Sequence, residues 1–182
     1  LFKKALNISP NHVNILTNYS ATLNAQGEFE AAIDTGLKAI TIQPDFTDAY
    51  NNLGNAYLSA GKLSEAIINL KKAVELQPLN ARAHNNLGNA LLDTGCPEDA
   101  IESYKKALSL DPSHLRTHSN FIYCYQYLST GNFSELNQYL QDWNQRHGQT
   151  GIFSSQKFID NKNSRQRLRL GFVSSDLRRH PV

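Results

Sequence analysis

Residues 47–80 read TDAYNNLGNAYLSAGKLSEAIINLKKAVELQPLN, and this stretch decides the fold. Within it, Tyr50, Leu53 and Tyr57 recur at the spacing of one helix face, which predicts an amphipathic first helix. Gly54 lies on the same stripe and is small enough to let a neighbouring helix approach closely. The first half of the stretch therefore predicts a helix suited to close packing.

The second half of the stretch predicts a second helix. Gly61 breaks the first helix, and Pro78 prevents the second from continuing. Between them, four apolar residues share one face, and the two alanines among them permit close packing: Ala66, Ile67, Leu70 and Ala73. One pair of helices cannot bury its apolar faces alone, so neighbouring pairs must stack.

The pattern returns every 34 residues along the chain. Three residue types keep this register, at Pro10, Pro44, Pro78 and Pro112, at Ala5, Ala39, Ala73 and Ala107, and at Gly27, Gly61 and Gly95. A period of 34 with two helices per unit is typical of tetratricopeptide repeats. The predicted fold is therefore an all-α tetratricopeptide-repeat superhelix, which is an α-solenoid.

The register also predicts domain boundaries. Residues 1–147 form the repeat array, which consists of a partial unit 1–12, units 13–46, 47–80 and 81–114, and a divergent unit 115–147. In that last unit the register decays from residue 129, but an amphipathic stripe predicts a closing helix over 133–147. Residues 148–166 are polar and aperiodic, which predicts a linker.

The final segment, residues 167–182, follows a different period. Leu168, Leu170 and Phe172 alternate with arginine or glycine, which predicts a short β-strand. A lone strand is not stable, so this one must join a sheet that the chain does not contain in full.

Composition and charge suit a soluble repeat protein and name no function. The chain contains no methionine and opens on LFKKAL, so we expect an internal piece of a longer protein. Its basic residues are concentrated in the tail, because residues 1–161 carry 12 Lys or Arg against 15 Asp or Glu. No apolar run is long enough to span a membrane, and Cys96 and Cys124 show no disulfide or metal-site pattern. We expect an intracellular, cytoplasmic protein without a metal site.

A row of asparagines lies on the helix side opposite the apolar stripe. In a solenoid of paired helices, this side lines the concave surface. A side-chain amide offers both a donor and an acceptor, which matches the backbone of an extended polypeptide. Six asparagines therefore predict a sequence-tolerant peptide-binding groove: Asn18, Asn52, Asn86 and Asn120, each 34 residues apart, and Asn55 and Asn89 in a partial second row.

The same recurrence has a second interpretation. Asparagines that bond to one another across units, to backbone or to water would recur simply because the repeat was duplicated. Tyr123 and Tyr127 extend the groove face and are either ligand contacts or contacts to the final helix. His84 and His118 lie on the core-facing stripe, where we expect them to act in packing.

The repeats, the segment THSNFIYCYQYL and the tail RLRLGFVSSDLRRHPV together resemble the O-linked N-acetylglucosamine transferases and the related Spindly proteins. The resemblance implies that the tail strand opens a Rossmann-like domain, truncated here, and that His180 lies at the parent enzyme's active site. It also implies a nucleotide sugar as the parent's donor substrate and Ser or Thr of proteins as acceptors, with N-acetylglucosamine as the expected sugar. The rest of the first catalytic lobe and all of the second are absent, so we expect no activity and no cofactor in this chain by itself.

A non-catalytic interaction scaffold is the alternative function. A carboxylate clamp is only partly matched, by Asn55, Asn86 and Arg116, because Asn51 and Asn120 stand where Lys or Arg is needed. Nucleic-acid binding is not expected, since the tail arginines are few and the repeats are mildly acidic. The expected partners are extended polypeptides, with neither nucleic acid nor membrane, and a homodimer through the repeats stays open.

Overall fold

The structure is a computed structural model, and it describes residues 1–128 and 133–147. In these ranges the chain forms nine α-helices and one short 3-10 turn. The helices are α1 (Phe2–Ile8), α2 (Val13–Ala25), α3 (Phe29–Ile42), α4 (Thr47–Ser59), α5 (Leu63–Leu76), α6 (Ala81–Asp93), α7 (Pro97–Leu110), α8 (Leu115–Cys124) and α9 (Phe133–His147), and the turn η1 (Tyr125–Tyr127) follows α8.

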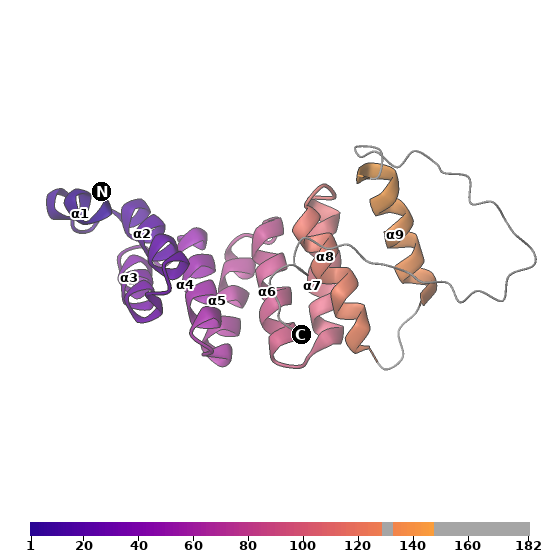
Figure 1. Cartoon of the computed structure of the whole chain (residues 1–182). Coiled ribbons are helices and arrows are strands. Elements are labelled where there is room, and N and C mark those ends of the chain that lie inside the picture. Colours follow the sequence, from indigo (N-terminus) through magenta and orange to yellow (C-terminus); the bar gives the residue numbers. More distant parts are fainter. Residues whose placement is uncertain (129–132, 148–182) are drawn as a thin grey trace, which may run out of the picture. The chain divides into compact units, whose positions relative to one another are not determined.

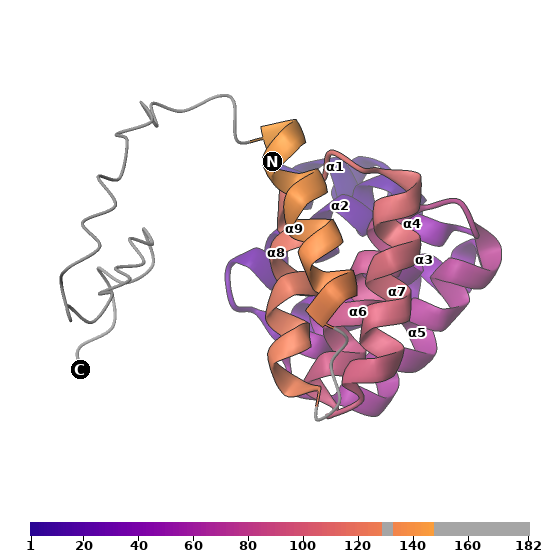
Figure 2. The same cartoon turned by 90° about the vertical axis from the view of Figure 1, so that its right-hand side faces the viewer.

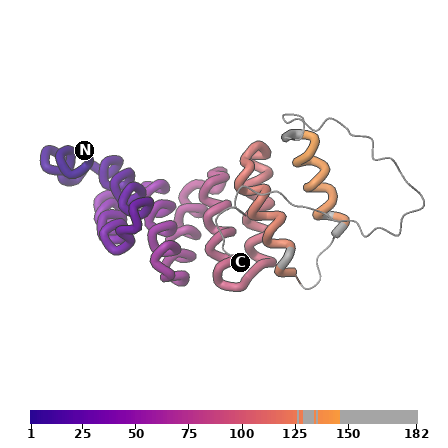
Figure 3. The backbone as a smooth tube through the Cα atoms, in the orientation of Figure 1, coloured from indigo at the N-terminus to yellow at the C-terminus, as the bar shows by residue number. Residues whose placement is uncertain are grey.

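The helices stack as consecutive pairs (Figure 1). Helices α2 and α3, α4 and α5, and α6 and α7 form three pairs, and each pair packs on the next. In addition, α2 contacts α4, α4 contacts α6, and α6 contacts α8, so the first helices of successive units form a continuous layer. The view along the stack (Figure 2) shows α8 and α7 in front of the earlier pairs. The backbone tube (Figure 3) shows the same helix–turn–helix path in each pair.

Each pair turns at a glycine with a left-handed backbone. Gly27, Gly61 and Gly95 have φ values of 81°, 73° and 77°, a region that side chains disfavour. The next residue closes the helix end, as when the Lys62 N–H donates to the Tyr57 carbonyl at 2.9 Å. This is the Schellman motif, and it explains why glycine keeps the 34-residue register.

Small residues set the spacing between helices. Ala32, Ala66 and Ala100 recur in the second helices of the pairs and are fully buried. A Cβ added at Gly88 would lie 2.6 Å from Tyr104 Cε1, so the absence of a side chain is what admits the tyrosine ring. The close approach that the sequence predicted at Gly54 is also present, since a Cβ added there would lie 2.6 Å from Leu70 Cγ.

The two stripe histidines fix the connections between units. His84 Nε2 lies 3.0 Å from the Pro78 carbonyl, and His118 Nε2 lies 3.0 Å from the Pro112 carbonyl. Both side chains are buried, so they join the inter-unit loop to the helix that follows it. The packing role that the sequence analysis expected for them agrees with this geometry.

The all-α solenoid predicted from the sequence is confirmed over the described residues, which contain no strand. None of the helices described there is both long and apolar enough to cross a lipid bilayer. The predicted linker at 148–166, the predicted strand in 167–182 and His180 lie outside the described residues.

Candidate functional site

The recurring asparagines form hydrogen bonds between successive units. Three of the four donate from Nδ2 to the residue 35 positions earlier, which lies on the preceding first helix. The bonds are Asn52 to the Thr17 carbonyl at 3.2 Å, Asn86 to Asn51 Oδ1 at 2.9 Å, and Asn120 to Asn85 Oδ1 at 3.4 Å. The cross-unit bonding that the sequence left open is therefore present, and it uses part of each amide.

The four asparagines differ in how much of the side chain is left to bind a ligand. Asn18 is exposed, and its side chain makes no hydrogen bond within the described part of the chain. Asn52 and Asn120 are half-buried. Asn86 is only 9% exposed, and it accepts at 3.2 Å from Asn85 Nδ2 as well as donating. Asn86 thus belongs to the structural network more than to an open surface.

Asn55 and Asn89, the two asparagines of the partial second row, differ in their hydrogen bonds. Asn55 is half-buried and has no side-chain hydrogen bond among the described residues. Asn89 Oδ1 accepts two hydrogen bonds, one from the Tyr104 hydroxyl at 2.8 Å and one from Asn120 Nδ2 at 2.8 Å. The structure therefore brings Asn89 and Asn120 together and holds both at fixed orientations.

A hollow of about 340 Å³ opens over this pair. We call it the α6–α8 hollow, and its polar lining consists of Asn89, Asp93, Tyr104, Arg116, Asn120 and Tyr123, with Leu58 and Leu92 as the apolar part. Three of its members come from α8, three from α6 and one, Leu58, from α4, so the hollow lies mostly on the layer of first helices. This lining offers a ligand amides, hydroxyls, one cation, one carboxylate and apolar surface.

Charged residues occupy a row one helical turn before the asparagines. Asp48 and Arg82, 34 residues apart, form an ion pair between α4 and α6. Arg116 holds the next position in this row, is exposed, and makes no ion pair within residues 1–128 and 133–147. Its guanidinium is therefore available to an anionic group of a ligand.

Tyr123 and Tyr127 lie beside each other at the end of this face. Their rings meet edge to face with centroids 5.2 Å apart, and their hydroxyls are hydrogen-bonded. They are 50% and 54% exposed, so they are not covered by α9. By contrast, Tyr139 of α9 packs on Phe121, with ring centroids 4.3 Å apart. The exposed pair thus extends the surface that a ligand can contact.

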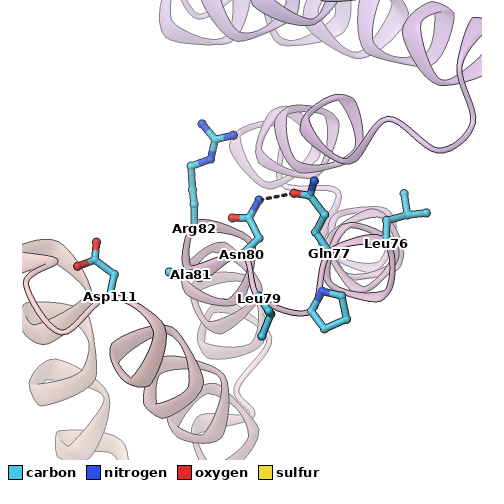
Figure 4. Close-up of a pocket in the computed structure, with 8 residues that line it drawn as sticks. Leu76, Gln77, Leu79, Asn80, Ala81, Arg82 and Asp111 are labelled. Carbon is cyan, nitrogen blue, oxygen red and sulfur yellow. Dashed lines mark hydrogen bonds between the residues drawn. The ribbon is translucent and has the colours of Figure 1, made fainter.

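A larger hollow of about 730 Å³ lies elsewhere, at the connection between α5 and α6 (Figure 4). The figure shows Asn80 donating to Gln77 across the connection, while Arg82 points away from Asp111. Arg82 is already paired with Asp48, and none of the six predicted asparagines lines this hollow. It is therefore the weaker candidate for a peptide site.

Sequence reasoning missed the polar role of one core residue. Tyr104 holds the position equivalent to Leu70 of the apolar face, yet its hydroxyl reaches the groove amide Asn89. Burial raises the pKa of Tyr104, so the hydroxyl stays protonated and remains a donor. A signal was present, because the equivalent positions hold Leu70 and Gly36, and only tyrosine carries a polar end.

The described residues hold no group of three or more His, Cys, Asp or Glu arranged to bind a metal ion. His180, the candidate catalytic residue of the parent enzyme, lies outside them. Within the described chain, the α6–α8 hollow and the asparagine rows are thus the candidate site, and their chemistry is that of binding.

Comparison with known families gives matches to models described as TPR repeat and tetratricopeptide repeat. These cover residues 1–34, 22–61, 54–95 and 81–114, and so extend together over residues 1–114. No curated protein sequence matches the chain.

Solved structures with the same fold include MamA, with a TM-score of 0.70 and 26% identity over 81% of this chain and 85% of that one. An O-GlcNAc transferase mutant from Thermobaculum terrenum aligns with a TM-score of 0.67 and 28% identity, over 74% of this chain and 26% of that enzyme. The first TPR of Spaghetti (RPAP3), solved bound to an HSP90 peptide, aligns at 0.61 and 23% identity over 65% of this chain and 94% of that one.

Proposed function

Because this chain belongs to the tetratricopeptide-repeat family through residues 1–114, we propose that it binds an extended polypeptide along the layer of α2, α4, α6 and α8. The α6–α8 hollow carries the proposal. Its amides leave Asn89 Nδ2 and Asn120 Oδ1 without partners in the described chain, beside the unpaired Arg116. These groups can bind backbone N–H and C=O, which every peptide offers.

The bound segment has few sequence requirements, because amides recognise its backbone and not its side chains. Arg116 adds a preference for an acidic residue, and the exposed Tyr123 and Tyr127 add apolar contact area. The expected ligand is therefore an extended, proline-poor segment with an acidic residue near the part that lies over α8.

We further propose that these repeats present protein substrates to the catalytic domain of a longer protein O-glycosyltransferase. The tail sequence and the 28% identity with the Thermobaculum terrenum enzyme support this proposal, although the match spans only 26% of that enzyme. In the parent, a nucleotide sugar would donate N-acetylglucosamine to Ser or Thr, with His180 at the active site.

A non-catalytic scaffold is the second candidate, and one observation favours it. The alignment with MamA covers 85% of that chain, so this fold makes up most of the solved MamA chain. An assay distinguishes the transferase from the scaffold. The full-length parent is incubated with nucleotide-activated N-acetylglucosamine and an acceptor protein. Labelled acceptor supports the transferase, whereas binding of acceptor without transfer supports the scaffold.

Peptide binding is tested on the 182-residue chain. An array of random peptides of about 15 residues, about 50 Å long when extended, is probed with the chain, and the tightest binder is measured by calorimetric titration. Joint replacement Asn89→Ala and Asn120→Ala is expected to weaken binding by about tenfold or more, as expected for two lost hydrogen bonds.

Asn69→Ala is the matched control, because Asn69 lies on α5 and, among the described residues, its side chain bonds only to the Glu65 carbonyl of its own helix. We expect it to change the affinity by less than about twofold. Equal weakening by both changes, or unchanged binding in a folded double variant, would rule out the hollow as the site. Light scattering on the same samples reports whether the repeats form a homodimer.

A further inference from the structure

A buried hydroxyl group lies beneath the α6–α8 hollow. Tyr104 is 0% exposed, and Gly88 leaves no spare room around its ring, since an added Cβ would lie 2.6 Å from Cε1. A buried donor needs an acceptor, and Asn89 Oδ1 accepts at 2.8 Å. Together with Asn120 Nδ2, the tyrosine hydroxyl therefore holds Asn89 Oδ1 inward.

This contact fixes what Asn89 offers to a ligand. Its Oδ1 accepts from both Tyr104 and Asn120, so its acceptor capacity is used inside the protein. Its Nδ2 has no hydrogen-bond partner in the part of the chain that the structure describes. Asn89 therefore presents a donor to the hollow.

Asn120 offers the opposite group. Its Nδ2 donates to Asn89 Oδ1 at 2.8 Å and to Asn85 Oδ1 at 3.4 Å, which uses both amide hydrogens. Its Oδ1 accepts no hydrogen bond from any residue in 1–128 or 133–147. The α6–α8 hollow thus presents one donor from α6 and one acceptor from α8, in a fixed order.

We propose that Tyr104 is a positioning residue that makes the α6–α8 hollow bind a peptide in one chain direction only. In an extended chain, the N–H and C=O of one residue point to the same side, and the N–H comes first. The N–H pairs with Asn120 Oδ1 and the C=O with Asn89 Nδ2. The ligand's N-terminus therefore lies toward α8 and its C-terminus toward α6, an inference that rests on the proposed peptide-binding function.

The first test needs no ligand. Tyr104→Phe keeps the ring in place over Gly88 and removes only the hydroxyl, so the fold is preserved while Asn89 Oδ1 loses one of its two donors. Side-chain amide signals of Asn89 and Asn120 in ¹H–¹⁵N spectra are expected to shift in this variant. They are expected to stay in place in Tyr50→Phe, whose hydroxyl has no hydrogen bond within the described residues. Unmoved Asn89 signals in Tyr104→Phe would overturn the proposal even if no peptide were found to bind.

The second test measures direction with the peptide selected on the array. A nitroxide label at its N-terminus is expected to broaden signals of α8, and a label at its C-terminus signals of α6 and α4. In Tyr104→Phe, each label is expected to broaden both groups. The reverse pattern in the wild type, or equal broadening by both labels there, contradicts the proposal without contradicting peptide binding.

Affinity supplies a further readout that a purely structural role would not change in the same way. Asn89→Asp keeps the acceptor that Tyr104 and Asn120 use but removes the donor that faces the ligand, so we expect binding about tenfold weaker. Tyr104→Phe is expected to weaken it about threefold, and Tyr50→Phe by less than about twofold. Wild-type affinity in Asn89→Asp would overturn the assigned donor.

Discussion

The second and third complete units, residues 47–80 and 81–114, share one fold but differ in their polar interior. In the second unit, Leu70 fills the space beside the stripe glycine, whereas in the third unit Tyr104 fills it. Only the tyrosine carries a hydroxyl that reaches a groove amide, Asn89. The same packing position is therefore purely apolar in one unit and also orients a surface side chain in the next.

The buried asparagines Asn51 and Asn85, which hold equivalent positions in the two units, also differ in their hydrogen bonds. Asn51 Nδ2 is buried and has no hydrogen-bond partner among the described residues, while its counterpart Asn85 donates to Asn86 Oδ1 at 3.2 Å. Asn85 Oδ1 also accepts from Thr117 Oγ1 at 3.0 Å. The two units therefore keep the same backbone pattern. Single differences in side chains between them determine which buried amides find hydrogen-bond partners and which groove residue is held in place.

The largest expected effect comes from adding a methyl group at the stripe glycines. Gly88→Ala would drive a Cβ into the Tyr104 ring, which cannot move aside, so we expect a loss of about 2–3 kcal/mol in the free energy of unfolding. Gly54→Ala meets the flexible Leu70 and is expected to cost about 1–2 kcal/mol. Urea denaturation measures both, and equal losses would show that the two units pack alike.

A smaller loss of stability is expected when Asn89 or Asn120, which are hydrogen-bonded to each other, is replaced by aspartate. Asn120→Asp would turn an acceptor toward Asn85 Oδ1 and Asn89 Oδ1, so we expect it to cost about 1–3 kcal/mol. Asn89→Asp keeps both bonds that it accepts and is expected to cost less than about 1 kcal/mol. A reversed order in urea denaturation would contradict the hydrogen-bond polarity described above.

Removal of the tyrosine hydroxyl is expected to cost about 1 kcal/mol, the usual net worth of one neutral hydrogen bond. Tyr104→Phe therefore measures the polar difference between the two units without a change in packing. Thermal unfolding of this variant against Tyr50→Phe, for which we expect a change within about 0.5 kcal/mol, provides the comparison. Equal stability of the two variants would show that the Tyr104 hydroxyl contributes nothing to the third unit.

The smallest effect is expected at the ion pair that joins the two units. Asp48 and Arg82 are both about half exposed, so solvent screens their attraction, and Asp48→Asn is expected to cost about 0.2–1 kcal/mol. The cost should shrink in high salt, because the pair lies at the surface. Denaturation at low and high ionic strength tests this, and a salt-independent loss would contradict a screened pair.

Much of the fold could be predicted from the sequence, because proline, alanine and glycine at a period of 34 each act through the backbone. Gly61 needs a left-handed conformation, and Pro78 prevents the preceding helix from continuing. The candidate site was predictable in its positions but not in its bonding. Whether Asn86 is open or buried depends on how closely α4 and α6 approach, which periodicity does not specify.

The orientation of the Asn89 side chain could not be predicted from the sequence. It depends on a hydroxyl that belongs to a different helix, 15 residues later, and on the exact depth at which Tyr104 sits over Gly88. The sequence pattern assigns Tyr104 to the core and does not reveal its hydrogen bond to Asn89. Only the packed arrangement shows that one side chain serves both the core and the groove.

Chemical-shift mapping tests the central claim most directly. The array-selected peptide is titrated into the ¹⁵N-labelled 182-residue chain, and the perturbed signals are located on the helices. We expect these signals to cluster at Asn89, Arg116, Asn120 and Tyr123, on α6 and α8. Clustering at Leu79 and Asp111, around the larger hollow of Figure 4, or along α3, α5 and α7, would contradict it.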